Sequence, residues 1–225
     1  MTPRFRPEGL RFLRSLKRNN RREWFNAHRD DYDAHVRQPM LDIIASLAED
    51  MRVFAPEILV NPKSMYRIYR DVRFSENKAP YKTHVAASFP TRGLPKHEGA
   101  GLYFHVSPDE LWVGGGMYAP QTAQLHAVRE HIAANVRRLR AIVESPAFRR
   151  EYGKLEGEQL QRVPRGFPKD HEAVHYLRYR QFLAGREFPP AFATSPRFYG
   201  ALVNAFKRAA PLIRFLNEPL IGSSG

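Results

Sequence analysis

The sequence predicts an α+β fold in which a central antiparallel sheet of about four or more strands lies between N-terminal and C-terminal helices. Apolar residues recur every three or four positions over residues 5–53 and again over residues 121–217, which is the period of an α-helix. Over residues 63–117 the period changes to two, which is typical of strands with one buried face. Since no linker-like stretch separates these regions, we expect one domain over residues 1–225 with a short flexible tail at 218–225.

The N-terminal region is predicted to contain two helices. Asn20 is expected to cap the second, because Glu23 three residues later can bond back to the amide of the cap in a capping box. Pro39 falls inside the pattern of this second helix, so we expect a kink or two abutting helices there. The first helix is expected from Pro7 to Asn19. Its apolar face holds three leucines: Leu10, Leu13 and Leu16.

Four strands are predicted, and the last two form a hairpin. The turn of this hairpin is expected at Ser107 to Glu110, because Pro108 occupies the second turn position, which proline favours. Three consecutive glycines, Gly114 to Gly116, predict a bulge or turn, or a place where another backbone or a ligand approaches. The strands are expected at residues 63–70, 81–89, 102–106 and 111–115.

The C-terminal region is predicted to hold three helices, at residues 125–142, at about 170–183 and from Ser195 onward. Ser195 suits the N-cap position because Pro196 follows it at the first helical position. Pro211 lies inside the third helix and is expected to break or bend it.

The composition limits the classes of function. The chain has no cysteine, which excludes disulfides, thiol catalysis and cysteine-ligated metal centres. It shows no apolar run long enough for a membrane span and no glycine-rich nucleotide loop, so we expect a cytoplasmic protein without membrane contact or cofactor. The formal net charge of +13 favours an anionic partner, although the codon bias of a GC-rich genome, which favours arginine, would give the same excess.

The densest chemistry lies in residues 67–81, where the first two predicted strands meet in a turn, and Lys82 follows directly. Cationic side chains there outnumber the carboxylates of Asp71 and Glu76, and arginine can hold a phosphate or carboxylate with two parallel hydrogen bonds. If the site is catalytic, Asp71 or His84 is the candidate proton donor or acceptor. The segment therefore predicts a site for a small anionic ligand. Its binding residues are Arg67, Arg70, Arg73, Lys78, Tyr81 and Lys82.

The same segment resembles the signature of a family of conserved hypothetical bacterial and fungal proteins, catalogued as domain of unknown function family 2461. That signature reads Arg-x-x-Arg-Asp-x-Arg-Phe, then Asn or Asp before Lys, then Tyr three residues on. The resemblance extends to an Asn-Asn-x-x-x-Trp-Phe stretch at Asn19 and a Pro-Arg-Gly-Phe stretch at Pro164, and so covers essentially the whole chain. It implies no particular activity. The matching residues are Arg67, Arg70, Asp71, Arg73, Phe74, Asn77, Lys78 and Tyr81.

Two residues outside the motif, Arg165 and His171, are secondary candidates for the site. His171 begins a His-Glu-x-x-His spacing that ends at His175, which on one helix would place two zinc ligands on the same face. Because Asp170 puts this spacing in the first turn of the predicted helix and no third ligand follows, no metal is expected. His171 is instead assigned to capping or to lining the site.

Two other interpretations remain open for the protein. It could be a nucleic-acid-binding module whose basic C-terminal helices, with Arg178 and Arg180, contact the phosphate backbone. It could also be a scaffold without a ligand, in which Asp71 and Glu76 hold the arginines of the motif in a salt-bridge network.

Overall fold

The computed structural model describes residues 2–95 and 98–221 and shows an α+β fold, as the sequence predicts. Within these residues, four strands form one antiparallel sheet with the order β1-β2-β3-β4. Buried and half-buried residues alternate along β2, so one face of the sheet belongs to the core. The strands are β1 (Val85–Pro90), β2 (Gly101–Val106), β3 (Leu111–Met117) and β4 (Phe182–Phe188).

Helices precede and follow the first three strands. The N-terminal elements are α1 (Pro7–Arg18), α2 (Arg22–Ala27), α3 (Arg29–Tyr32), the π-helical turn η1 (Asp33–Arg37) and α4 (Gln38–Phe54). The C-terminal helices are α5 (Thr122–Ala134), α6 (Val136–Val143), α7 (Pro146–Tyr152), α8 (Val174–Leu177) and α9 (Phe198–Asn217). Two 3-10 turns are η2 (Pro62–Ser64) and η3 (Pro190–Thr194). In the part of the chain that the structure describes, no helix is long and apolar enough to cross a membrane.

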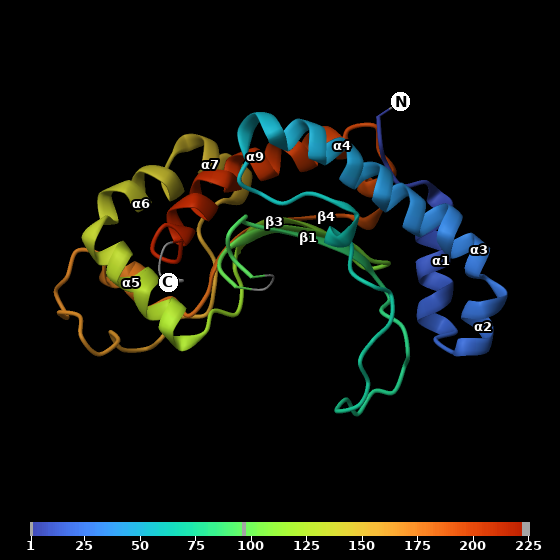
Figure 1. Cartoon of the computed structure of the whole chain (residues 1–225), viewed down its shortest axis with the longest axis horizontal. Coiled ribbons are helices and arrows are strands. Elements are labelled where there is room, and N and C mark those ends of the chain that lie inside the picture. Colours follow the sequence, from blue (N-terminus) through green and yellow to red (C-terminus); the bar gives the residue numbers. More distant parts are fainter. Residues whose placement is uncertain (1, 96–97, 222–225) are drawn as a thin grey trace.

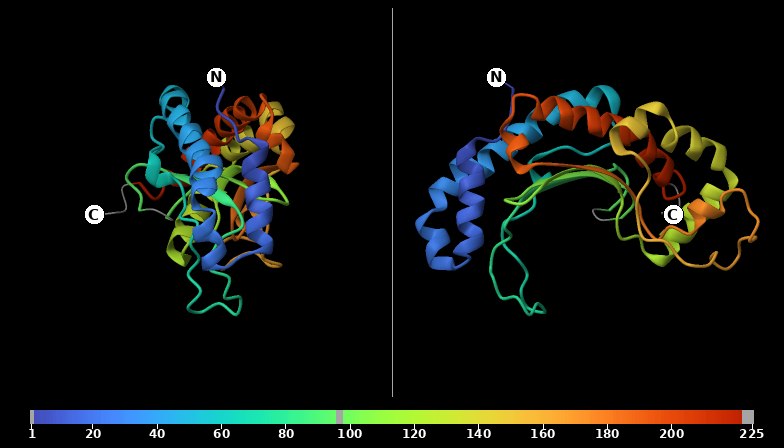
Figure 2. Two further views of the ribbon diagram at one scale, coloured as in Figure 1. Left: turned by 90° about the vertical axis from the view of Figure 1, so that its right-hand side faces the viewer. Right: turned by 180° about the vertical axis from the view of Figure 1, so that it is seen from behind.

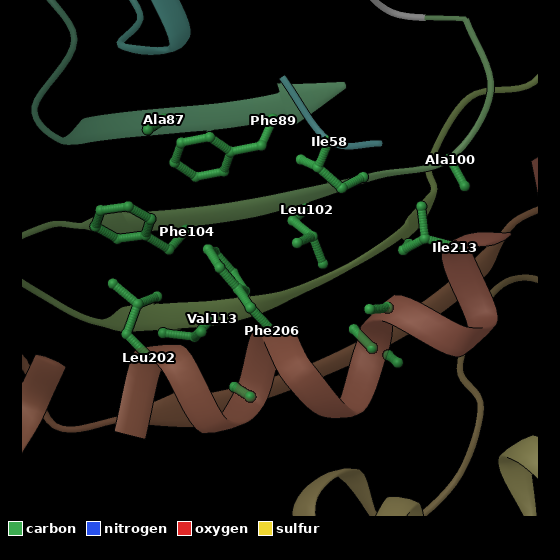
Figure 3. Packing of buried hydrophobic residues seen from close by; sticks show 14 of the residues in the cluster. Ile58, Ala87, Phe89, Ala100, Leu102, Phe104, Val113, Leu202, Phe206 and Ile213 are labelled. Atoms are coloured by element: carbon green, nitrogen blue, oxygen red, sulfur yellow. The ribbon is translucent and has the colours of Figure 1, made fainter. Parts of the chain in front are cut away.

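The elements form an arch, with α4 and α9 over one face of the curved sheet (Figure 1). Helices α1 to α3 make one end of the arch and α5 and α6 make the other (Figure 2). The core lies between the sheet and α9, where the rings of Phe89 and Phe104 stack at 6.3 Å and Phe206 meets both rings at steeper angles (Figure 3). Burial of each phenylalanine contributes about 1.5–3 kcal/mol, so this contact fixes α9 on the sheet.

The predicted hairpin is confirmed. Strands β2 and β3 pair from Gly101 to Val106, and the turn closes with a hydrogen bond from the backbone N–H of Ser107 to the carbonyl of Glu110 at 2.9 Å. The hydroxyl of Ser107 accepts from the backbone N–H groups of Asp109 and Glu110, which satisfies two donors that the turn would otherwise leave unpaired.

The three glycines of β3 allow a close approach of another backbone, which is one of the two predicted roles. A Cβ on Gly114 would lie 2.1 Å from the carbonyl oxygen of Ala184 in β4 and 2.9 Å from the ring of Trp112. On Gly185, which pairs with Gly114, a Cβ would lie 2.0 Å from the same ring. Glycine is therefore required at these positions because Trp112 and the β4 backbone fill the space.

Strand β4 overturns the prediction of one helix over about 170–183. Only α8 is helical there, and Phe182 and Leu183 already pair with Met117 and Gly116 of β3. The residues between Leu177 and Leu183 have good intrinsic helix propensity, but pairing with the open edge of β3 satisfies their backbone groups and buries Phe182.

The predicted N-cap at Asn20 is also wrong. Helix α2 begins at Arg22 with Arg21 at the cap and no side-chain cap bond, while the side chain of Asn20 bonds to the backbone of Tyr81. Pro39 has the expected effect on geometry. Because proline has no N–H to donate, the regular helical ladder is interrupted, and the π-helical turn η1 precedes α4.

Several boundaries in the C-terminal region differ from those predicted. The helix expected at 125–142 is divided at Asn135 into α5 and α6. Helix α9 begins at Phe198, three residues after Ser195, and it continues through Pro211 to Asn217. Of the predicted tail, residues 218–221 form a turn after α9, and residues 222–225 lie outside the described part. Residues 96–97 of the loop before β2 also lie outside it.

Candidate functional site

Residues 67–82 form a ribbon that projects beyond the sheet (Figures 1 and 2). The two predicted strands do run antiparallel, but the first is reduced to isolated bridges that join Met65 to Ala87 and Tyr69 to Tyr81. Beyond these bridges, the N–H of Arg70 donates to the carbonyl of Pro80 at 2.9 Å. We call residues 70–80, which extend past this bond, the arm.

The cations of the arm mostly donate to the arm itself. The guanidinium of Arg70 donates to the carbonyl of Ala79 at 3.2 Å and to the hydroxyl of Ser75 at 3.3 Å. The ammonium of Lys78 donates to the carbonyl of Val72 at 3.1 Å. These bonds hold the loop in shape without neutralising its charge, because backbone carbonyls carry no formal charge.

Asp71 acts as the partner of Arg73. Their side chains meet through two short contacts, Nη2 to Oδ2 at 2.7 Å and Nε to Oδ1 at 3.0 Å, and both residues are exposed. The hydrogen bonds from Arg73 lower the pKa of the Asp71 carboxyl group and raise the pKa of Arg73. Asp71 thus holds Arg73, and its lowered pKa makes it a weaker proton acceptor.

Tyr81, Lys82 and His84 leave the arm and approach β1. Tyr81 is 3 % exposed, and its ring stacks on Phe25 with a centroid distance of 4.1 Å, so its role is packing between the ribbon and α2. Lys82 donates to the carbonyl of Arg67 at 2.9 Å, and its ammonium lies over the ring of Tyr66.

His84 is half-buried beside His105, with ring centroids 5.6 Å apart. Burial, followed by the charges of His105 and Lys82, lowers the pKa of His84 to about 4, so the ring is neutral at pH 7. No hydrogen bond or ion pair joins His84 to Asp71 among the described residues. The two candidate catalytic residues are therefore not brought together by the fold.

Arg67 lies at a hollow of about 480 Å³ between α2, α3, η1 and residues 62–69. Arg29 and Arg37 also line it, and Asp33 is the only carboxylate that the described residues contribute to its lining. The guanidinium of Arg67 forms no hydrogen bond or ion pair within the described part of the chain. We call this the α3–η1 hollow. Its aromatic and apolar walls come from Phe25, Tyr32, Tyr66, Tyr69, Met65 and Ile68.

The charges of this hollow are incompletely paired. Asp33 Oδ2 lies 3.9 Å from Nε of Arg29, and Asp33 Oδ1 lies 4.0 Å from Nε of Arg37. Both distances exceed a normal hydrogen bond, so one carboxylate is shared loosely by two guanidinium groups. Burial raises the pKa of Tyr32 to about 12, with a further contribution from the charge of Asp33.

The two secondary candidates lie elsewhere. Arg165 is exposed at a second hollow beside α5. The Nδ1 atom of His171 accepts a hydrogen bond from the backbone N–H of Ala173 at 3.0 Å, so His171 does serve a local turn just before α8. Because α8 begins only at Val174, His171 and His175 do not share a helix. Among residues 2–95 and 98–221, no group of three or more metal-ligating side chains is found.

The two arginines that were predicted to contact nucleic acid do not lie on a long helix. Arg178 and Arg180 follow α8 in the turn that leads to β4. The Nε atom of Arg178 donates to the carbonyl of Leu160 at 2.7 Å, and Arg180 lies 3.4 Å from the carboxylate of Glu158. Their side chains thus hold residues 158–160 against this turn.

The sequence reasoning missed Arg29 and Arg37. Both lie four residues from Asp33, one on each side, which on a helix places all three on one face. This spacing was visible in the sequence, but it is typical of solvent-exposed helices in general. Only the approach of Arg67 from the ribbon distinguishes these two arginines from ordinary surface pairs.

Comparison with known proteins gives one result. A family model described as "Conserved hypothetical protein (DUF2461)" matches residues 8–215. No curated protein and no solved structure gives a significant match. The match reaches from the first turn of α1 to the last turn of α9 and includes the ribbon, the arm and both hollows. The chain therefore belongs to the DUF2461 family of conserved hypothetical proteins.

Proposed function

We propose that this protein binds a small phosphate-bearing or carboxylate-bearing ligand in the α3–η1 hollow. The observation that carries the proposal is that, in the part of the chain that the structure describes, Arg29, Arg37 and Arg67 line the hollow with Asp33 as its only carboxylate. An anion that enters would meet three guanidinium groups, each of which can offer two parallel N–H donors. The volume of about 480 Å³ is within the range of small-molecule sites.

Arg67 is the residue of the motif that would contact the ligand. Its guanidinium breaks no existing bond on binding, since it has no partner within the described residues. Arg29 and Arg37 would exchange a loose contact with Asp33 for closer bonds to the ligand. The aromatic walls would exclude water from the less polar part of the ligand, and a lower local dielectric strengthens the charged contacts.

The other cations of the motif would support this site from the arm. Arg70, Lys78 and Lys82 hold backbone carbonyls of the ribbon, which fixes the strand that carries Arg67. They also keep the local potential positive and would attract an anion toward the hollow. Neither Asp71 nor His84 lines the hollow, so binding rather than catalysis is proposed.

The test measures the binding of inorganic phosphate, pyrophosphate and citrate to the wild-type chain and to Arg67→Ala by calorimetry and by thermal shift. Loss of one charge-assisted contact costs about 1.5–3 kcal/mol, which corresponds to a roughly 10-fold to 150-fold weaker affinity. Arg73→Ala is the matched control, because it removes the same charge from an exposed site in the arm. The control should change the affinity by less than about 3-fold, since exposed charges are largely screened.

Equal losses in Arg67→Ala and Arg73→Ala would contradict the assignment to the hollow, because they would indicate a general charge effect. No binding of any of the three anions to the wild-type chain would contradict the proposal itself.

Nucleic-acid binding is a second candidate, favoured by the tip of the arm. Phe74 is 96 % exposed there, and the guanidinium of Arg73 lies 5.8 Å from its ring centroid. An exposed ring beside a cation suits stacking on an unpaired base next to a phosphate. This candidate predicts affinity for single-stranded oligonucleotides that falls steeply with salt and is reduced by Phe74→Ala. Val53→Ala, which truncates another exposed apolar side chain, is the control and should leave the affinity unchanged.

A further inference from the structure

Helix α5 lies at the opposite end of the arch from α3 (Figures 1 and 2). A second hollow of about 480 Å³ lies beside this helix. It is bounded by the chain between β3 and α5, by the start of α5, and by the segment that leads into β4. Among the described residues, three arginines line it, and Glu158 is the only carboxylate in this lining. We call it the α5 hollow. The lining arginines are Arg129, Arg165 and Arg180.

Arg129 is the unusual residue of this hollow. Its residue exposure is 9 %, although arginine is rarely this buried without a carboxylate partner. Its Nη2 atom donates to the carbonyl of Tyr179 at 2.9 Å, while its Nε atom is buried and has no hydrogen-bond partner in the described residues. No carboxylate of the described chain lies within ion-pair distance of it. Burial, and then the nearby charge of Arg180, lower the pKa of Arg129.

A buried charge without a counter-ion lowers the stability of the folded state. In other proteins, removal of one member of a buried ion pair typically costs several kcal/mol, because the remaining charge is left uncompensated. The fold keeps this charge at the wall of a hollow rather than in solid packing, so a counter-ion has room to reach it. Hydrophobic residues of similar volume would fill the same position at less cost if the role were packing alone.

The remaining charges of the hollow do not supply that counter-ion. Arg165 is exposed and has no partner within the described residues. Glu158 lies 3.4 Å from Arg180 and is exposed, so it is already shared with the third arginine. Two positive charges therefore remain without a carboxylate around the hollow.

We propose that the α5 hollow is a second anion site that binds the dianionic phosphate group of a small ligand. A dianion matches the two uncompensated arginines, and the fork geometry of Arg129 and Arg165 suits the tetrahedral oxygens of a phosphate. Thr122 and Gln181 also line the hollow and offer neutral hydrogen-bonding groups to the rest of the ligand. This proposal is independent of the α3–η1 hollow, because no residue is shared between the two linings.

The experiment is a titration of inorganic phosphate into the full chain with isotope-labelled histidine, followed through the ring signals of His126, which lines this hollow. The His126 signal is assigned with His126→Gln. Saturable shifts are expected in the wild-type chain and in Arg67→Ala, which separates this site from the first. Acetate at equal ionic strength should bind more weakly, because it carries one charge.

Arg165→Ala and Arg129→Met are expected to weaken phosphate binding by about tenfold or more each. Arg162→Ala is the matched control, since Arg162 is exposed on the same loop but does not line the hollow. If Arg129→Met does not fold, Arg165→Ala still decides the question, because its side chain is exposed and contributes little to packing.

The absence of a saturable His126 shift in the wild-type chain would overturn the proposal. Equal phosphate affinities of Arg165→Ala and Arg162→Ala would overturn it as well. Phosphate should also raise the melting temperature of the wild-type chain more than that of Arg129→Met, because only the wild type has the buried charge to neutralise.

Discussion

Replacement of Asn20 by serine would separate two roles for this residue. Serine caps a helix about as well as asparagine does, so a residue that only capped α2 would tolerate the change. In the structure, the side chain of Asn20 accepts from the backbone N–H of Tyr81 at 3.0 Å and donates to the carbonyl of Tyr81 at 2.9 Å. Serine has a shorter side chain with a single oxygen and cannot make both bonds.

The magnitude follows from these two bonds. Each contributes about 0.5–1.5 kcal/mol net, so Asn20→Ser should lower the free energy of unfolding by about 1–3 kcal/mol. For a chain of this size, the melting temperature should fall by about 2–12 °C. Because Tyr81 stacks on Phe25 at the wall of the α3–η1 hollow, phosphate binding there should weaken as well.

The assay is urea unfolding of the wild type, Asn20→Ser and Asn20→Ala, followed by circular dichroism. If Asn20 joins α2 to the ribbon, both variants lose similar stability, because both lose the two bonds to Tyr81. If Asn20 acts as a cap, serine retains the stability and only alanine loses it. A serine variant within about 0.5 kcal/mol of the wild type would therefore refute the bridging role.

Two further predictions test the sheet. The pKa of His84 is lowered from 6.5 to about 4, so the unfolded chain takes up a proton that the native state resists, and stability should be lost as the pH falls from 6.5 toward 4. His84→Gln should reduce this slope in urea titrations at several pH values, and an unchanged slope would show that another group causes it. Gly185→Ala should cost about 1–3 kcal/mol and shift the tryptophan fluorescence, because its Cβ would lie 2.0 Å from the ring of Trp112. The control, Gly200→Ala in α9, has no atom within 4 Å of its Cβ and should be neutral or stabilising; similar losses in both variants would contradict the packing argument.

Much of the fold could be predicted from local patterns. Helix α1 runs from Pro7 to Arg18, as its leucine spacing predicts, and the hairpin closes at Ser107 to Glu110. Both features are decided by residues close together in the sequence, through amphipathic period and turn chemistry. Strand β4 could not be predicted in this way, because its state depends on the distant edge of β3.

The candidate site likewise has features that the local sequence predicts and features that depend on distant contacts. The sequence located a dense group of cations at residues 67–82, and the family signature that these residues carry is consistent with the family match. It did not show that Tyr81 is buried, that Asp71 is held by Arg73, or that Arg67 meets Arg29 and Arg37 at a hollow.

The sequence by itself therefore determined the α+β class and the family, and its basic residues predict an anionic ligand. Only the tertiary structure decided the surroundings of individual cations: among the described residues, Arg67 lies without a partner at one hollow, and Arg129 is buried without a carboxylate partner at the other. The physical reason is that charge and periodicity are properties of the local chain. Pairing and burial depend instead on contacts between segments far apart, such as the 50 residues that separate Arg129 from its partner Tyr179.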